Sequence, residues 1–252
     1  MYKDVLKDKV VVITGTTSGI GEAMARLFAA QGAKVVGSGR REEKGEGIMQ
    51  EIRDAGGECF FVKTDVSDHT QIKRLIDTAV EKYGRIDILV NNAALEPTIM
   101  LKDLEWDQFV EVINTNLGAY VMGARYALDY MLPQKSGKIL NINSVTSEQI
   151  VPGVGVYSLA KAGIRNLTKT IALEYAREGI RCNEVCPGLI MAGAFMDPAV
   201  REWAKDSIEN GTPVPRLGKA EEIAHAALYL LSDEADFCNG TSLFVDGGRR
   251  LI

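Results

Sequence analysis

Tyr157 and Lys161 stand four positions apart in the run YSLAK, and Ser144 precedes the tyrosine in the chain. Residues four apart on a helix share one face, so a helix here would bring the phenol and the ammonium into one small volume. Ketone reduction needs a proton on the oxygen, and alcohol oxidation needs a base beside the hydroxyl. The spacing therefore predicts a proton-transfer site built on Tyr157 and Lys161.

A tyrosine alone is a poor base at neutral pH, because its ordinary pKa is about 10. Lowering that pKa to roughly 7 requires on the order of 4 kcal/mol of preferential stabilisation of the phenolate. One ammonium at about 4 Å, with an effective dielectric constant near 20, supplies roughly 4 kcal/mol. Lys161 is thus sufficient in magnitude to activate Tyr157.

A glycine-rich segment, TGTTSGIG at 14–21, follows an apolar run and precedes a helical pattern that ends before Gly32. A strand, a tight turn and a helix N-terminus direct backbone N–H groups and the positive end of the helix dipole toward a pyrophosphate. We therefore expect a dinucleotide here, contacted by Gly15, Thr17, Ser18, Gly19, Ile20 and Gly21.

These motifs sit in a regular alternation of short apolar runs and amphipathic stretches. Strands are expected at 9–14, 34–38, 59–64, 86–91, 138–144, 180–186 and 241–246, and helices at 19–31, 42–55, 68–83, 103–131, 155–178 and 219–232. Nearly continuous apolar strands separated by helices are typical of a parallel sheet covered on both faces. The prediction is a single-domain doubly wound Rossmann fold (α/β) over 1–252, with a seven-stranded parallel sheet.

The glycine spacing is Gly-x3-Gly-x-Gly, and with it the sequence resembles the short-chain dehydrogenase/reductase family from end to end. The resemblance rests on Thr14 to Gly21, Asp65-Val66, Asn91-Asn92-Ala93-Ala94, Asn116, Ser144, Tyr157-x3-Lys161, Pro187-Gly188 and Asp246-Gly247-Gly248. It implies that Ser144 polarises the substrate oxygen and that Lys161 also holds the cofactor ribose. It further implies that Asn116 anchors a water chain behind Lys161.

The same resemblance implies the remaining cofactor contacts. Asp65 and Val66 would contact the adenine, and Asn91 would lie near the adjoining ribose. Further contacts would come from Ala93, Tyr157, Lys161, Pro187, Gly188 and Ile190. Two positions depart from the family pattern: Ala94 stands where glycine is usual, and Ala192 where threonine is frequent. Without that threonine hydroxyl, the backbone of Ile190 is expected to hold the nicotinamide amide.

The choice between the two nicotinamide cofactors depends on Ser38-Gly39-Arg40-Arg41, at the end of the second strand. A carboxylate there would bind the ribose hydroxyls of NAD, whereas arginine offers charge-assisted hydrogen bonds to a 2′-phosphate. No carboxylate is present, so NADP(H) is predicted, held by Arg40 with Ser38 and Arg41 assisting. The alternative is NAD(H), with both arginines merely opening a solvated helix.

The segment 189–215 is longer than a crossover needs and is interpreted as a substrate lid. Met191, Phe195, Met196 and Trp203 favour a substrate with an apolar body, such as a hydroxysteroid or bile acid, although the lid could also pack these residues on itself. A 3-oxoacyl thioester and a sugar acid or polyol are the alternatives. Glu148 and Gln149 could border the pocket, but the sequence does not give their direction.

Two other functions compete with the dehydrogenase interpretation. A catalytically silent dinucleotide-binding regulator would lack one of the four catalytic side chains, and all four are present. A dehydratase or epimerase on the same scaffold is the second alternative, since a fold does not fix the reaction. Such a redox-neutral enzyme would leave the reduced cofactor unconsumed.

Composition narrows the partners to small molecules. The 252 residues are 46% hydrophobic with a net charge of -5 and no long basic block, which argues against nucleic-acid binding. Two histidines and four scattered cysteines give neither a metal site nor a disulfide framework, so reduced core thiols are expected.

Without a recognisable signal segment or membrane span, we expect a cytoplasmic protein. Family resemblance suggests a homotetramer or homodimer formed through the helices at 103–131 and 155–178.

Overall fold

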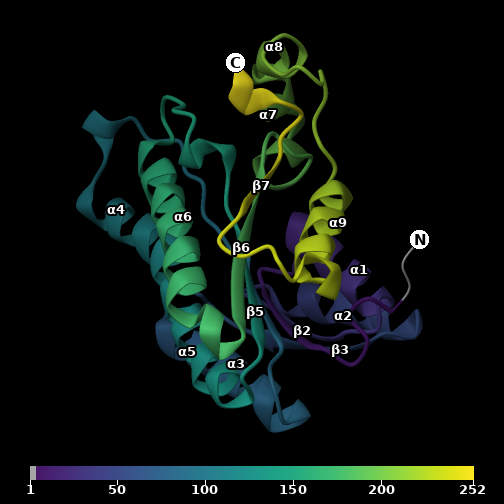
Figure 1. Cartoon of the computed structure of the whole chain (residues 1–252). Coiled ribbons are helices and arrows are strands. Elements are labelled where there is room, and N and C mark those ends of the chain that lie inside the picture. Colours follow the sequence, from purple (N-terminus) through teal and green to yellow (C-terminus); the bar gives the residue numbers. More distant parts are fainter. Residues whose placement is uncertain (1–3) are drawn as a thin grey trace.

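The computed structural model describes residues 4–252, apart from the side chains of Ala194 and Trp203. Seven parallel strands form one sheet in the order β3-β2-β1-β4-β5-β6-β7 (Figure 1). The strands are β1 (Val10–Thr14), β2 (Lys34–Gly39), β3 (Glu58–Lys63), β4 (Ile88–Asn91), β5 (Gly137–Ile142), β6 (Ile180–Pro187) and β7 (Ser242–Val245). The strand order reverses direction between β1 and β4, so the expected doubly wound Rossmann architecture is confirmed.

The helices cover both faces of this sheet (Figure 1). They are α1 (Gly19–Ala30), α2 (Glu42–Asp54), α3 (His69–Tyr83), α4 (Trp106–Ile113), α5 (Ala119–Gln134), α6 (Gly155–Tyr175), α7 (Pro198–Trp203), α8 (Lys205–Glu209) and α9 (Ala220–Leu231). Alternate strand residues point to opposite faces, so Val11 and Ile13 join the core under α1, α2 and α9, whereas Val12 joins the core under α3, α5 and α6. Both cores are completely buried, which explains the continuous apolar character of the strands.

The long helix expected at 103–131 is interrupted. A short turn, η1 (Leu101–Asp103), precedes α4, which begins later because Glu105 and Gln108 form a reciprocal N-terminal cap. A π-helical turn, η2 (Asn114–Gly118), then separates α4 from α5. Such turns are frequent at functional sites, and this one carries the buried Asn116.

The fifth strand also ends earlier than expected. Ser144 lies beyond β5 and caps a 3₁₀ turn, η3 (Val145–Ser147), because its hydroxyl accepts the N–H of Thr146 at 3.2 Å.

Cys182 and Cys186 are free, fully buried thiols in β6, as expected. In the described part of the chain, we find no helix with the length and apolar character that crossing a membrane requires.

The expected lid contains η5 (Gly193–Met196), α7 and α8, and it contacts the C-terminal segment. Arg249 donates to the carbonyls of Ser207 and Gly211, each at 3.0 Å, and Val214 N–H donates to Gly247 at 3.0 Å. Figure 1 shows α7 and α8 beside the C-terminus. The expected contribution of the Trp203 side chain lies outside the described residues.

Candidate active site

The predicted site residues gather around the carboxyl ends of the central strands, where open α/β sheets bind ligands. The glycine-rich turn follows β1, Asn91 ends β4, Ser144 follows β5 and Pro187 ends β6. Tyr157 and Lys161 come from α6, which packs against β6 and η3.

The turn after β1 requires glycine for two separate reasons. Gly15 has a φ of +77°, a left-handed backbone conformation that favours glycine. At Gly21, an added Cβ would lie 2.1 Å from the Gly15 carbonyl oxygen, so any side chain would force the turn open. Helix α1 starts at Gly19, and the Ser18 side chain makes no capping bond within the described chain. The first N–H groups of α1 therefore suit an anionic pyrophosphate.

A hydrogen-bonded clamp holds this turn against the end of β4. The Thr14 hydroxyl accepts the N–H groups of Asn92 and Ala93 at 2.9 and 3.1 Å. The Asn92 side-chain amide donates to the carbonyls of Thr14 and Gly15 at 2.8 and 3.1 Å. Asn92 thus fixes the cofactor turn, a role that sequence reasoning did not assign to it.

The three residues expected at the 2′-phosphate have different environments. Ser38 is fully buried, and its hydroxyl donates to the Ile13 carbonyl at 3.2 Å, so this geometry does not favour the expected assistance from Ser38. Arg41 donates to the hydroxyls of Thr17 and Ser18 at 2.7 and 2.9 Å. Arg40 is exposed and makes no hydrogen bond or ion pair with the described residues.

The expected adenine and ribose contacts are also divided. One carboxylate oxygen of Asp65 accepts the N–H and hydroxyl of Ser67 at 3.0 and 2.8 Å, and Val66 is buried. Asn91 is buried, and its side chain donates to Asn141 at 3.0 Å instead of facing outward. The Asn91 side chain is therefore occupied within the core, and its expected ribose contact stays a prediction.

The segment after β6 lies close to both the last strand and the cofactor turn. A Cβ at Gly188, the residue after Pro187, would lie 2.8 Å from the Asp246 Cα. The buried Ile190 forms an isolated bridge with Gly218, and its carbonyl accepts the Ala192 N–H at 2.7 Å. Ala192 lies where a Cβ at Gly19 would meet its methyl group at 3.0 Å, so this segment faces the start of α1.

Lys161 is buried between two tyrosine rings. Its ammonium lies 5.4 Å from the Tyr157 ring centre and 5.2 Å from that of Tyr120. It donates to the Ile142 carbonyl at 2.7 Å and to the Tyr120 hydroxyl at 3.5 Å, while that hydroxyl donates to Ile142 at 3.0 Å. Tyr120 is therefore a second neighbour of the ammonium, which sequence reasoning did not identify.

Burial dominates the protonation of this pair in the chain itself. It raises the pKa of Tyr157 above its ordinary value; the negative charge of Glu96 raises it further, and hydrogen bonding with Ser144 lowers it. Burial lowers the pKa of Lys161 to about 8, and Glu96 opposes that change. The expected activation of the phenol by Lys161 does not outweigh burial here. A positive charge on an oxidised nicotinamide nearby would favour the phenolate.

Ser144 and Asn116 are both buried, and both are held by neighbouring groups. The Ser144 oxygen accepts from the N–H and the hydroxyl of Thr146, at 3.2 and 3.0 Å. The Asn116 side chain accepts the Leu95 N–H at 2.7 Å and donates to the Leu95 carbonyl at 2.6 Å. Asn116 thereby positions the loop after β4, and the role in a water chain that the resemblance implied stays a prediction.

That loop carries Glu96, a functional candidate that sequence reasoning missed. Leu95 is held by Asn116 on one side, and the Ile99 N–H donates to the Gly153 carbonyl at 2.7 Å on the other. Glu96 is an exposed residue, yet burial of its carboxyl group raises the pKa of that group, while the Lys161 charge lowers it. Glu96 therefore adds a negative charge within electrostatic range of the proton-transfer pair.

The remaining substrate-side expectations have mixed outcomes. Met191 and Met196 are exposed on the lid segment, as an apolar substrate surface requires. Glu148 forms an ion pair with Arg165, and the Gln149 side chain donates to the Ile252 carbonyl at 3.4 Å.

Among the described residues, no group of three or more histidine, cysteine, aspartate or glutamate side chains is arranged to hold a metal ion.

Comparisons with known proteins show which proteins this chain is similar to. Residues 15–250 match a family model described as enoyl-(acyl carrier protein) reductase. The chain is 40% identical over its whole length to a 3beta-hydroxysteroid dehydrogenase of Eggerthella lenta, of which it covers 97%. It is 37% identical to a 3-oxoacyl-acyl-carrier-protein reductase of Thermotoga maritima, with 96% of this chain and 98% of the relative covered.

A solved structure gives the same result in three dimensions. It is a gluconate 5-dehydrogenase from Burkholderia cenocepacia in complex with NADP and tartrate, and it is 34% identical to this chain. The TM-score is 0.92, with 99% of this chain and 98% of that chain covered.

Proposed function

The chain belongs to the short-chain dehydrogenase/reductase family and is an NAD(P)-dependent oxidoreductase that interconverts carbonyl and alcohol groups; we propose that it uses NADP(H) and carries out proton transfer through Tyr157. One observation carries the proposal. The buried Tyr157 and Lys161 share one face of α6, and Ser144 lies beside the phenol at the end of the sheet that holds the glycine-rich turn.

Each side chain has a distinct task in this proposal. When bound, the cofactor supplies or accepts the hydride. Ser144 donates a hydrogen bond to the substrate oxygen, and Tyr157 gives that oxygen a proton during reduction or removes one during oxidation. Lys161 stabilises the phenolate and is itself held by the Ile142 carbonyl, which leaves N–H donors for the ribose. Asn116 holds the loop that closes this side of the site.

The preference for NADP(H) is supported by Arg40, which follows β2 and whose exposed guanidinium has no partner among the described residues. Arg41 is already bonded to Thr17 and Ser18, so it contributes charge from a fixed position. The similar gluconate 5-dehydrogenase was solved with NADP, which agrees with this assignment.

For the substrate, we favour a ketone or secondary alcohol on an apolar ring system, such as a hydroxysteroid or bile acid. The exposed Met191 and Met196 and the similarity to a 3beta-hydroxysteroid dehydrogenase support this class. A sugar acid or polyol is the second candidate, because Glu96 places a hydrogen-bond acceptor near the proton-transfer pair. The similarity to a 3-oxoacyl-acyl-carrier-protein reductase supports the third candidate, a 3-oxoacyl thioester.

Assembly as a homodimer or homotetramer is part of the same proposal. Tyr120 and Leu128 on α5 are buried in the core, so they are not available to an interface. Exposed apolar side chains on α5 and α6 take their place: Val121, Leu159 and Leu173. Light scattering of the purified protein measures the assembly size.

The experiment is a panel of steroid, polyol and oxoacyl substrates assayed with NADPH and NADH, in both directions, with Tyr157→Phe as the test variant. We expect turnover to fall by about 10² to 10⁴-fold in Tyr157→Phe, while the melting temperature and NADPH affinity change little. Tyr126→Phe, which removes a hydroxyl bonded to His69 at 2.8 Å on α3, is the matched control and should keep full activity. Near-normal turnover by Tyr157→Phe would exclude the proposed role.

A further inference from the structure

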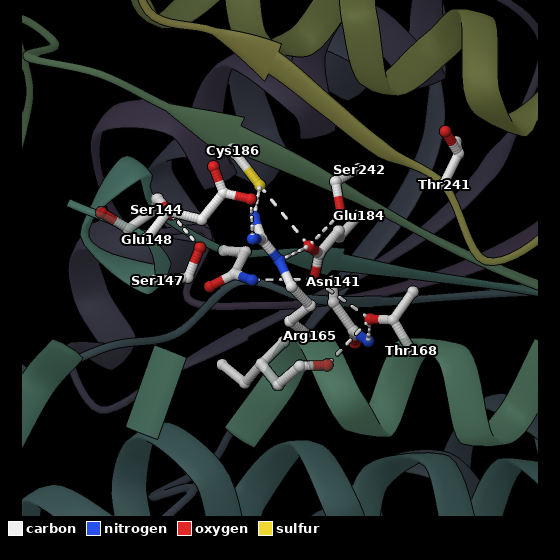
Figure 2. A network of polar contacts seen from close by, with 12 residues as sticks. Asn141, Ser144, Ser147, Glu148, Arg165, Thr168, Glu184, Cys186, Thr241 and Ser242 are labelled. Carbon is white, nitrogen blue, oxygen red and sulfur yellow. Dashed lines mark hydrogen bonds and ion pairs between the residues drawn. The ribbon is translucent and has the colours of Figure 1, made fainter. Parts of the chain in front are cut away.

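A carboxylate in the middle of β6 is buried with a complete set of partners. Glu184 is fully inaccessible and accepts hydrogen bonds from Arg165 at 3.2 Å, Asn143 at 2.7 Å, Ser242 at 2.6 Å and Thr168 at 3.2 Å (Figure 2). A buried charge is costly unless it is paired and hydrogen-bonded. These contacts therefore join the end of β5, the edge strand β7 and helix α6 around one side chain.

Arg165 connects this carboxylate to the helix that carries the proton-transfer pair. It stands four residues after Lys161 and eight after Tyr157, about one and two turns along α6. Its Nε bonds Glu184, and its Nη1 forms an ion pair with Glu148, the residue that follows η3. The guanidinium thus holds a strand and a loop at fixed positions relative to α6.

Together with the chain from Asn143 to Glu148, these contacts form a closed ring that includes Ser144. Asn143 and Glu148 lie at the two ends of a six-residue arc that contains Ser144, and each end is bonded to the Arg165–Glu184 pair. Figure 2 shows Arg165 and Glu184 at the centre of these contacts, with Ser144 and Ser147 beside Glu148. Within the arc, the Ser144 oxygen already accepts from Thr146, so its direction follows the conformation of the arc.

We propose that Arg165 and Glu184 act as a positioning pair that sets the Ser144 hydroxyl at its working distance from Tyr157. The inference rests on the proposed function, in which Ser144 and Tyr157 contact one substrate oxygen. Catalytic groups must be held within about 0.5 Å of the productive geometry, and a 1 Å displacement can cost about 10²-fold in rate. The pair meets this need because Glu184 bonds Asn143, next to Ser144, while Arg165 is part of α6, the helix that carries Tyr157.

The test is a double-mutant cycle against Ser144→Ala. We compare Arg165→Met/Glu184→Gln, which removes both buried charges together, with the wild type and with the same changes in Ser144→Ala. The pair variant should lose about tenfold or more in kcat with NADPH affinity within twofold. In the Ser144→Ala background the same changes should cost no further activity, since there is no hydroxyl left to position.

Glu148→Ala is a second variant for the case in which the pair variant does not fold. It removes the ion pair of Arg165 with Glu148, the more exposed member of the ring. It should lower kcat in the wild type and leave kcat of Ser144→Ala unchanged. Asp87→Asn is the stability control: Asp87 is a buried carboxylate that pairs with Arg85 and accepts the Val10 N–H at 2.9 Å, at the amino end of β4 and so at the end of the strands opposite the site. It should lower the melting temperature without changing kcat.

The outcomes separate this inference from the proposed function. If Ser144→Ala loses activity but the ring variants reduce kcat by the same factor in both backgrounds, the positioning role is wrong and the proposed function stands. Unchanged kcat in the ring variants also overturns the positioning role alone. If Ser144→Ala itself keeps full activity, the proposed role of Ser144 fails and the inference fails with it.

Discussion

The Asn116 side chain bonds both backbone polar groups of Leu95, accepting its N–H at 2.7 Å and donating to its carbonyl at 2.6 Å. Asn116 is fully buried in the π-helical turn η2, and Leu95 belongs to the loop that follows β4. This contact makes the position of Glu96, the next residue, depend on a side chain from a distant part of the chain.

Replacing Asn116 by alanine should weaken both the fold and the reaction. Two backbone groups of Leu95 lose their partners, and an unpaired buried polar group costs about 1 to 3 kcal/mol. We expect the free energy of unfolding in urea to fall by roughly 2 to 4 kcal/mol, and kcat to fall at least tenfold because the loop beside Lys161 is released.

Asn239 offers a matched control for this variant. Its side chain also bridges two backbone groups, accepting the Cys182 N–H and donating to the Ala172 carbonyl, each at 3.0 Å, but at the amino end of β6. Asn239→Ala should lower stability and leave kcat intact. Equal losses of kcat in both variants would show that Asn116 acts only through overall stability.

Glu96→Gln should move the pH dependence of alcohol oxidation to lower pH. A negative charge disfavours the phenolate and favours the ammonium, so Glu96 raises the pKa of both Tyr157 and Lys161. The neutral glutamine removes this effect, and the two coupled pKa values both fall. The base form is then populated at lower pH, which moves the acidic limb of the kcat profile downward.

The measurement is kcat for oxidation across the pH range with saturating cofactor. Glu174→Gln on α6 makes the same change in net charge at an exposed position near the far end of that helix and should leave the profile unchanged. An acidic limb of Glu96→Gln that stays in place, or moves to higher pH, contradicts the electrostatic role of Glu96.

The sequence was sufficient for the parts of the site that depend on local pattern. The strand, turn and helix around Gly15 and Gly21 follow from backbone requirements within a few residues, and the i,i+4 spacing placed Tyr157 and Lys161 on one face. The apolar runs identified all seven strands because both faces of a parallel sheet are covered.

Side-chain direction and long-range partners could not be predicted in this way. Ser38 was expected to face a phosphate, but the strand that carries it is buried on both faces, so its hydroxyl bonds Ile13 instead. Glu184 and Arg165 lie on different elements and pair only after α6 has packed on β6. A glutamate in the middle of a predicted strand was the available signal, because a carboxylate buried there requires a partner.

Arg40→Ala and Arg41→Ala should separate phosphate recognition from support of the turn. Arg40 is exposed and unpaired among the described residues, so its loss should raise KM for NADPH by about 10 to 100-fold and leave KM for NADH nearly unchanged. Arg41 also donates to Thr17 and Ser18, so its loss should weaken both cofactors. A preference for NADH that survives Arg40→Ala would overturn the NADP(H) assignment.

Adding one methyl group at Gly21 and at Gly47 should have opposite effects. At Gly21 the new Cβ would lie 2.1 Å from the Gly15 carbonyl oxygen, and relieving such a contact costs about 1 to 3 kcal/mol or more and distorts the pyrophosphate turn. At Gly47, inside α2, no heavy atom lies within 4 Å of the new Cβ, so alanine should stabilise the helix by about 0.5 to 1 kcal/mol.

Thermal unfolding with and without NADPH measures both effects. Gly21→Ala should melt several degrees lower and lose the stabilisation by cofactor, whereas Gly47→Ala should melt higher and keep it. Normal cofactor binding by Gly21→Ala would mean that the turn tolerates a side chain and that its contact with Gly15 does not shape the site.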